Sequence, residues 1–194
     1  MNYYVADLHF GHENVIKFDN RPFTNVDEMD FALMENWNAR VTDEDHVYIL
    51  GDFCYRAKEK PSWYLKQLKG KKHLIQGNHD QKLLQDEEAI EQLESIEKMQ
   101  FVKDGGNAIV LCHFPLAEWN GFFRGGWHIY GHIHGKCHKT FGYMKKLERA
   151  LNAGCMINRY QPVTFGELVE NNTKFIIEEK EKCCIIHISE NGRY

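Results

Sequence analysis

Side chains that can bind metal ions occur in five short segments of this 194-residue chain, each where an apolar run gives way to Gly, Pro or a turn. In chain order, the segments are Asp7-Leu8-His9, Gly51-Asp52, Gly77-Asn78-His79-Asp80, Cys112-His113-Phe114-Pro115 and Gly131-His132-Ile133-His134. Their carboxylate, imidazole and amide groups suit Mn²⁺, Fe or Zn²⁺ better than a soft ion. The set therefore predicts a site for divalent cations.

Taken singly, most of these segments also have an ordinary structural interpretation. Gly51-Asp52 after a strand is typical of a turn, and a lone His113 is more often a core histidine. Gly131-His132-Ile133-His134 is the strongest single segment. Residues two apart in an extended segment point the same way, so Asp7 can act with His9, and His132 with His134. The prediction depends on the whole set, with each member at a strand end.

Apolar runs predict the elements that must position these side chains. We expect strands at residues 3–6, 46–50, 73–76 and 127–130, and a hairpin of residues 101–103 and 107–112 around Asp104-Gly105-Gly106. Because strands alternate with helical patterns, the fold class should be α/β or mixed. In such sheets ligands bind beyond the carboxyl ends of the strands, which is where the five segments fall.

Helical spacing predicts a helix over residues 26–37, with Thr24 as its N-cap, and another from Pro61 to Gly70. A Glu-rich helix should follow the third strand and bury Leu83, Leu84, Ile90 and Leu93. Thr164-x-x-Glu167 is a capping box for a short helix, and residues 175–177 and 183–188 suggest a terminal hairpin. Without repeats or linkers, residues 1–194 should form a single domain.

Composition excludes several classes of protein. With 43% hydrophobic and 27% charged residues, the chain can supply a core, unlike a disordered or disulfide-stapled one. No apolar run approaches the ~18 residues of a membrane span, and the N-terminus shows no secretory signal. A net charge of −4 argues against stable nucleic-acid binding. We expect a cytoplasmic protein without a membrane partner, whose six cysteines, with no C-x-x-C pair, are mostly packing thiols.

The five segments together resemble the signature of the calcineurin-like metallophosphoesterases over residues 7 to 134. Residues 7–12 and 21–23 are similar to small stand-alone bacterial and phage members, and residues 151–154 and 161–164 to their closing strand and helix. Met156 departs from the pattern, because many relatives carry a carboxylate there. The resemblance implies a four-layer α-β-β-α sandwich with a two-metal site at one edge of the sheets.

The resemblance also implies a role for each donor. Asp7, His9 and His134 would hold one cation, Asn78, His113 and His132 the other, and Asp52 would bridge both. A carboxylate suits the bridge because it can share its two oxygens. The cations would be two divalent ions, with Mn²⁺ the leading choice and Fe or Zn²⁺ as alternatives. A hydroxide between them would attack phosphorus.

The leaving oxygen then needs a proton. We expect His79 to supply it as general acid, with Asp80 orienting its ring, although His79 could instead only bind phosphate. His12, Arg21 and Arg124 are candidates for substrate binding. The loop of residues 119–127, rich in aromatic residues and glycine, could stack a base or complete the core.

The expected function is hydrolysis of a small or exposed phosphodiester. A phosphomonoesterase or a nucleotide pyrophosphohydrolase would use the same groups, and sequence does not separate the three. A non-catalytic metal-binding scaffold is less favoured because the donor set is complete, and a nuclease because the chain lacks a basic surface. We expect the substrate to be a small phosphate ester or nucleotide, and the sequence leaves its identity and the oligomeric state open.

Overall fold

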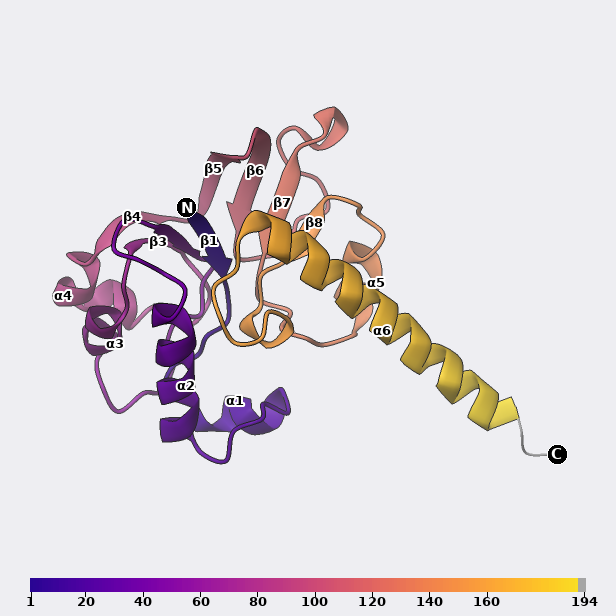
Figure 1. Cartoon of the computed structure of the whole chain (residues 1–194), viewed down its shortest axis with the longest axis horizontal. Coiled ribbons are helices and arrows are strands. Elements are labelled where there is room, and N and C mark those ends of the chain that lie inside the picture. Colours follow the sequence, from indigo (N-terminus) through magenta and orange to yellow (C-terminus); the bar gives the residue numbers. More distant parts are fainter. Residues whose placement is uncertain (192–194) are drawn as a thin grey trace.

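The computed structural model describes the backbone of residues 1–191 and the side chains of residues 1–179. Two four-stranded sheets form its framework (Figure 1). The first sheet is parallel throughout, in the order β1 (Asn2–Val5), β2 (His46–Ile49), β3 (Lys71–Ile75) and β4 (Leu93–Glu97). The second has the order β5 (Met99–Asp104), β6 (Asn107–Cys112), β7 (Trp127–Tyr130) and β8 (Ala150–Asn152), with only β5 antiparallel to its neighbour.

Helices connect and cover these strands. The α-helices of the described backbone are α1 (Glu13–Phe18), α2 (Val26–Asn38), α3 (Pro61–Gln67), α4 (Glu87–Ile90), α5 (Lys139–Met144) and α6 (Phe165–Asn191). Short 3₁₀ helices lie at η1 (Leu83–Gln85), η2 (Phe122–Arg124) and η3 (Cys155–Ile157). The chain therefore folds as a mixed α/β structure, in agreement with the alternating pattern of its sequence.

Three apolar clusters hold the elements together. One joins β1, β2 and β3 to α2 and α3, with Trp37 and Leu65 among its fully buried side chains. A second contains residues of both sheets, such as Tyr48 and Leu111, so the sheets share a buried layer. The third joins β6, β7 and β8 to α5 and to Phe175 and Ile176 of α6. Burying a side chain of this size contributes about 1.5–3 kcal/mol, which makes these clusters the main source of stability.

The predicted strands and the β5–β6 hairpin are confirmed. The helix predicted over residues 26–37 is also confirmed, but its N-cap is Asn25 rather than Thr24. The Asn25 side chain accepts a hydrogen bond from the Glu28 backbone N–H at 2.9 Å, whereas Thr24 bonds to the Glu28 carboxylate. Thr and Asn are both good capping residues, and Asn25 is the cap because the first helical turn begins at Val26.

The Glu-rich helix predicted after the third strand is wrong. That stretch divides into η1, α4 and the edge strand β4, which pairs in parallel with β3. The two apolar residues of this strand, Leu93 and Ile96, are three positions apart, which is a helical spacing, so the local pattern did not indicate a strand. The helix begun by Pro61 is confirmed, but it ends at Gln67, before Gly70.

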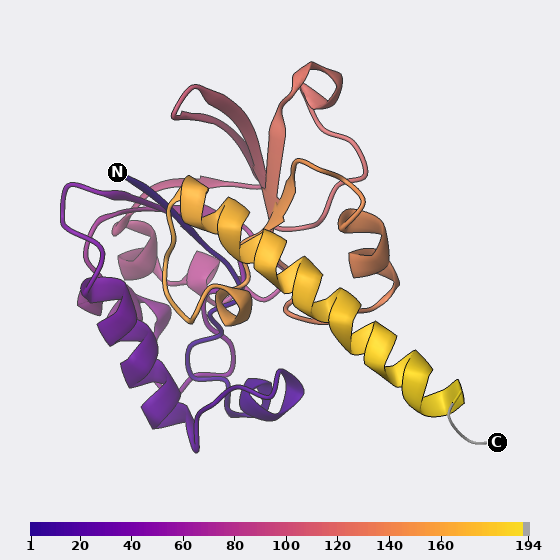
Figure 2. The ribbon, with the colours of Figure 1, turned by 45° about the vertical axis from the view of Figure 1, so that its right-hand side comes forward.

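The C-terminal segment also differs from expectation. The capping box is confirmed, because the Thr164 N–H and hydroxyl both donate to the Glu167 carboxylate at 2.9 Å. However, the helix that it opens is not short, and the terminal hairpin is wrong, because the backbone stays helical to Asn191. Phe175 and Ile176 pack against the third cluster from this helix. Beyond that contact α6 extends away from the body of the molecule (Figures 1 and 2).

None of the described helices is long and apolar enough to cross a membrane.

Candidate metal centre

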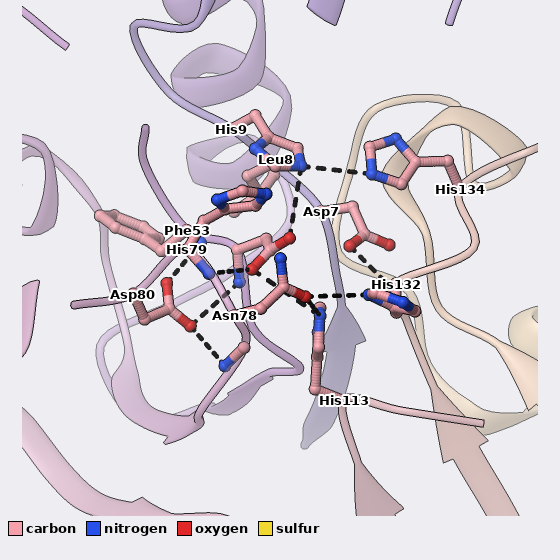
Figure 3. Close-up of polar contacts among 12 residues, drawn as sticks. Asp7, Leu8, His9, Phe53, Asn78, His79, Asp80, His113, His132 and His134 are labelled. Atoms are coloured by element: carbon pink, nitrogen blue, oxygen red, sulfur yellow. Dashed lines mark hydrogen bonds and ion pairs between the residues drawn. The ribbon is translucent and has the colours of Figure 1, made fainter. Parts of the chain in front are cut away.

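The seven predicted metal donors converge at the carboxyl ends of five strands (Figure 3). Asp7 and His9 follow β1, Asp52 follows β2, and Asn78 follows β3. His113 follows β6, and His132 and His134 follow β7. The six donors that Figure 3 labels point toward one another from both sheets: Asp7, His9, Asn78, His113, His132 and His134. Donors up to 127 positions apart in the chain therefore share one site.

A first donor group consists of Asp7, His9, Asp52 and His134. Each residue offers one ligand atom, and these four atoms lie within 4.8 Å of one another. The Nε2 atom of His9 is 3.3 Å from Nε2 of His134 and 3.6 Å from Oδ2 of Asp52. Two imidazole nitrogens and two carboxylates at this spacing form a suitable cage for one divalent cation.

A second donor group lies on the other side of Asp52. The side-chain oxygen of Asn78 is 3.0 Å from His113 Nε2 and 2.9 Å from His132 Nδ1. The Asp52 Oδ1 atom is 3.7 Å from the same His113 nitrogen. The two carboxylate oxygens of Asp52 therefore face different donor groups, which is the arrangement that a bridging ligand needs.

The electrostatics of the first group fit a cation. Burial raises the pKa of Asp7 to about 6, since little water reaches its carboxylate. Its Oδ2 atom is buried and has no hydrogen-bond partner in the described chain. Burial also lowers the pKa of His9, which keeps the imidazole neutral and able to bind metal. A positive charge between these groups would offset the cost of burying the carboxylate.

The backbone conformation of the donors differs from the one that their spacing in the sequence predicts. Asp7, His9, Asp52, His132 and His134 all have positive φ angles, between 53° and 69°. The side chains two apart do converge, but the extended geometry assumed for them is wrong. Non-glycine residues in this region cost of order 1 kcal/mol or more each and tend to cluster at functional sites.

Close packing of the strand ends requires glycine at three of the five segments, namely at Gly51, Gly77 and Gly131. A Cβ atom on Gly51, whose φ is +80°, would lie 2.4 Å from His113 Nδ1. One on Gly131 would lie 2.7 Å from the Ala6 side chain and 3.1 Å from Asp7 Oδ2. Gly51 and Gly131 let the two sheets approach closely enough for their donors to meet.

Hydrogen bonds behind the donors fix the ring orientations. The Nδ1 atom of His113 bonds to the Leu50 carbonyl at 2.8 Å, which leaves Nε2 for the centre. The Nδ1 atom of His134 bonds to Asp19 Oδ2 at 2.6 Å. Burial would raise the Asp19 pKa, but the bonds from His134 and Arg21 outweigh it and lower that pKa. Such partners orient metal ligands and increase their basicity.

Asp19 was not predicted as a site residue, and neither was Asn152. The Asn152 side chain donates to the His134 carbonyl at 2.7 Å, and its backbone is held by Asn172 of α6. Only the stretch around Asn152 carried a sequence signal, as part of residues 151–154. Nothing in the local pattern marks Asp19, because its role depends on a partner 115 positions away.

The prediction that Arg21 binds substrate needs correction. Its guanidinium is buried and donates to the carbonyls of Asp7 and Leu8, each at 2.8 Å. It also pairs with Asp19 at 3.3 Å. These contacts occupy the hydrogen-bond donors of Arg21 and stabilise the strained turn after β1. Arg21 therefore positions the backbone of the metal donors and does not bind a phosphate.

The prediction that Arg124 binds substrate is also wrong. It lies in the exposed turn η2, just before the amino end of β7, whereas the centre lies beyond the carboxyl end of that strand. The surrounding loop mainly completes the core: Trp119 is buried and donates to the Gly126 carbonyl at 2.9 Å. Of the two interpretations of residues 119–127, the buried Trp119 supports completion of the core over stacking of a base.

Asp80 does not orient the His79 ring. Its buried carboxylate accepts hydrogen bonds from the backbone N–H groups of Asp52, Phe53 and Gly77, at 2.7–3.0 Å. Asp80 therefore ties the segment after β2 to the segment after β3 and places Asp52. This correction changes how Asp80 acts, but it keeps the residue at the site.

His79 and His12 lie beside the first donor group. The His79 N–H donates to Asp52 Oδ1 at 2.9 Å, and its half-buried ring lies 4.3 Å from the Tyr55 ring centroid. The His12 ring is buried, 5.5 Å from that of His9. Cys54 and Cys112 are buried thiols, as predicted, and burial raises the Cys54 pKa to about 12.

Comparison with known proteins shows the family but no activity. An uncharacterized protein of Methanocaldococcus jannaschii (MJ1445) is 32% identical over 170 residues, covering 87% of this chain and 89% of the relative. The chain belongs to the same family as that archaeal protein. The Gene 66 protein of Mycobacterium phage D29 is 28% identical over 159 residues, covering 69% of this chain and 78% of its own.

The fold has a solved counterpart. The crystal structure of AQ665, a protein of unknown function from Aquifex aeolicus, superposes with a TM-score of 0.65 and 26% identity. The similarity covers 84% of this chain and 94% of that one. No family model matches the chain.

Proposed function

We propose that this protein is a phosphoesterase that depends on two divalent cations, and that it is a member of the calcineurin-like metallophosphoesterases that its sequence resembles. One observation carries the proposal: the two oxygens of Asp52 face two separate groups of metal-binding side chains, at 3.6 Å from His9 and 3.7 Å from His113. A carboxylate buried between two such groups is difficult to explain by packing alone.

The arrangement of the core supports the same assignment. The second apolar cluster joins the two sheets, and the first and third clusters attach helices to their outer sides. We infer from this a four-layer α-β-β-α sandwich of the kind that the resemblance implies. In such a fold the centre would sit at the edge where both sheets present their strand ends.

Each donor group would hold one cation. Asp7, His9 and His134 would bind the first, Asn78, His113 and His132 the second, and Asp52 both. The oxygen and imidazole donors favour Mn²⁺, with Fe and Zn²⁺ as alternatives. When bound, such a pair supplies a water with a pKa lowered to about 7 and neutralises charge on phosphoryl oxygens.

His79 is our candidate for the general acid. Its backbone is anchored to Asp52 and its ring packs against Tyr55, so the imidazole is held next to the centre. From there it would donate a proton to the leaving oxygen of the ester. This proton matters most for a basic leaving group such as a nucleoside alkoxide, which is why we favour a phosphodiester substrate.

The proposal is tested by one side-by-side assay. Purified protein is stripped with EDTA, reloaded with Mn²⁺, and given bis-p-nitrophenyl phosphate, p-nitrophenyl phosphate, a 2′,3′-cyclic nucleotide and a dinucleoside polyphosphate. We expect Mn²⁺-dependent hydrolysis, fastest for a diester. Preference for the second or fourth compound would favour a phosphomonoesterase or a pyrophosphohydrolase. Inactivity on all four, or activity that survives chelation, would contradict the mechanism, and inactivity with bound metal would favour the scaffold.

A further inference from the structure

A cavity of about 380 Å³ opens directly beside the first donor group. His9, His79 and His134 line it on the side of the centre. The remaining wall includes His12, Phe18, Tyr55, Arg56 and Lys136, which come from three separate loops and helices. Its volume lies in the ~300–1,000 Å³ range of small-molecule sites. We call this cavity the anion pocket.

The wall of the anion pocket carries two positively charged side chains. Arg56 and Lys136 line it, and none of the described residues in its wall is acidic. Neither cation forms an ion pair with a carboxylate of the described chain. Asp19, behind His134, is already paired with His134 and Arg21. In a protein of net charge −4, two cations in one cavity that no carboxylate among residues 1–179 pairs with indicate an anionic ligand.

A larger neighbouring cavity of about 520 Å³ provides a contrast. Arg56 lines this one too, but Glu59, Asp86, Glu87 and Glu88 lie in the same wall as its lysines. The two signs of charge there offset each other. Only the anion pocket combines an excess of positive charge with direct contact to the candidate centre among the cavities described.

Local geometry holds the two cations at the pocket. The guanidinium of Arg56 lies 5.2 Å from the Tyr55 ring centroid, and Lys136 Nζ lies 5.9 Å from that of Phe18. The backbone of Arg56 has a φ of +54°, a strained value for a residue with a side chain. The buried Nδ1 atom of His12 has no partner in the described chain, so the wall also has an unused polar group.

We propose that the anion pocket binds a second, non-reacting phosphate of the substrate, held by Arg56 and Lys136. The substrate class would be phosphodiesters that carry a further phosphate near the scissile bond, as in a 3′-phosphorylated nucleotide ester. This inference rests on the proposed function for its kinetic test, but the pocket can be tested separately by binding. Charge-assisted hydrogen bonds to a phosphate change affinity by about tenfold or more each.

The kinetic test compares two esters that differ only in the second phosphate: thymidine 5′-(p-nitrophenyl phosphate) and its 3′-phosphorylated counterpart. With Mn²⁺-loaded protein, we expect KM to be about 100-fold lower for the 3′-phosphorylated ester, with about tenfold from each cation. Arg56→Gln and Lys136→Gln should each reduce that ratio toward one. Lys58→Gln is the matched control, because Lys58 lies nearby but lines the two other large cavities. Equal KM values in the wild type, or a ratio that survives both variants, would overturn the proposal.

A binding measurement separates this inference from the proposed function. Calorimetry of the Mn²⁺-loaded protein would compare thymidine 3′,5′-bisphosphate with thymidine 5′-monophosphate. If neither ester is hydrolysed, the proposed function fails for this substrate class, while tighter binding of the bisphosphate that Arg56→Gln abolishes still supports the pocket. Equal binding of both nucleotides would overturn the pocket whatever the activity.

Discussion

At the residue scale, Asp52 makes the sharpest prediction. Asp52→Asn replaces one of the two facing oxygens by an NH₂ group, which cannot bind a cation. Because the substitution also removes the negative charge that both cations would share, we expect both to be lost together. Metal analysis after dialysis against trace Mn²⁺ would measure this. Asp104→Asn, at the far hairpin, should keep the full complement. Loss of one ion with tight retention of the other would show that Asp52 is not a bridge.

His79 is tested by separating metal binding from proton transfer. His79→Asn should keep both cations, because the contact to Asp52 is made by the backbone N–H. Turnover should fall about 10²–10⁴-fold for an ester with an alkoxide leaving group, and far less for p-nitrophenyl esters, whose leaving group needs no proton. Steady-state rates on the two ester types give the comparison. Equal losses on both would assign His79 to phosphate binding only.

At the element scale, the start of α6 can be tested through its capping box. Thr164→Ala removes the hydroxyl that bonds to Glu167, and this should cost about 1 kcal/mol. For a chain of this size, Tm should fall by roughly 2–4 °C. Thr173→Ala is the control on the same helix, since this exposed hydroxyl only bonds to the Val169 carbonyl. If calorimetry gave the same Tm for both variants, the Thr164 cap would not contribute to the stability of α6.

At the scale of the whole molecule, metal binding should be linked to folding. The donors come from both sheets, so a bound cation connects them, and unfolding disperses the site. Free Mn²⁺ at 100 times its Kd should add about 2.7 kcal/mol for one site, or a Tm increase of roughly 5–10 °C.

Two histidine variants control this measurement. His134→Asn removes a donor of the first group and should reduce the Mn²⁺-induced increase in Tm. His138→Asn changes an exposed histidine at the start of α5 and should leave the increase intact. If the Tm of the wild type were the same with and without Mn²⁺, no bound cation would connect the sheets.

Local patterns were sufficient to predict which side chains could bind metal and where they lie along the chain. Asp7, Asp52 and His132 each follow an apolar run that ends at a turn, and both features are short-range properties of the polypeptide. The strands at residues 46–50 and 127–130 were predictable for the same reason: a buried strand has to be apolar. The short run at residues 175–177 was ambiguous because length and periodicity do not separate strand from helix there.

Three-dimensional packing was needed for everything that depends on a distant partner. Arg21 looks like a phosphate ligand until its guanidinium is found buried against the carbonyls of Asp7 and Leu8. Asp19 carries no local signal, because its role is set by His134. Likewise, Arg56 and Lys136, 80 positions apart, form one cationic pocket only after β2 and β7 are brought together. Spacing along a chain constrains neighbours, whereas burial and charge pairing between remote residues arise only when the sheets pack.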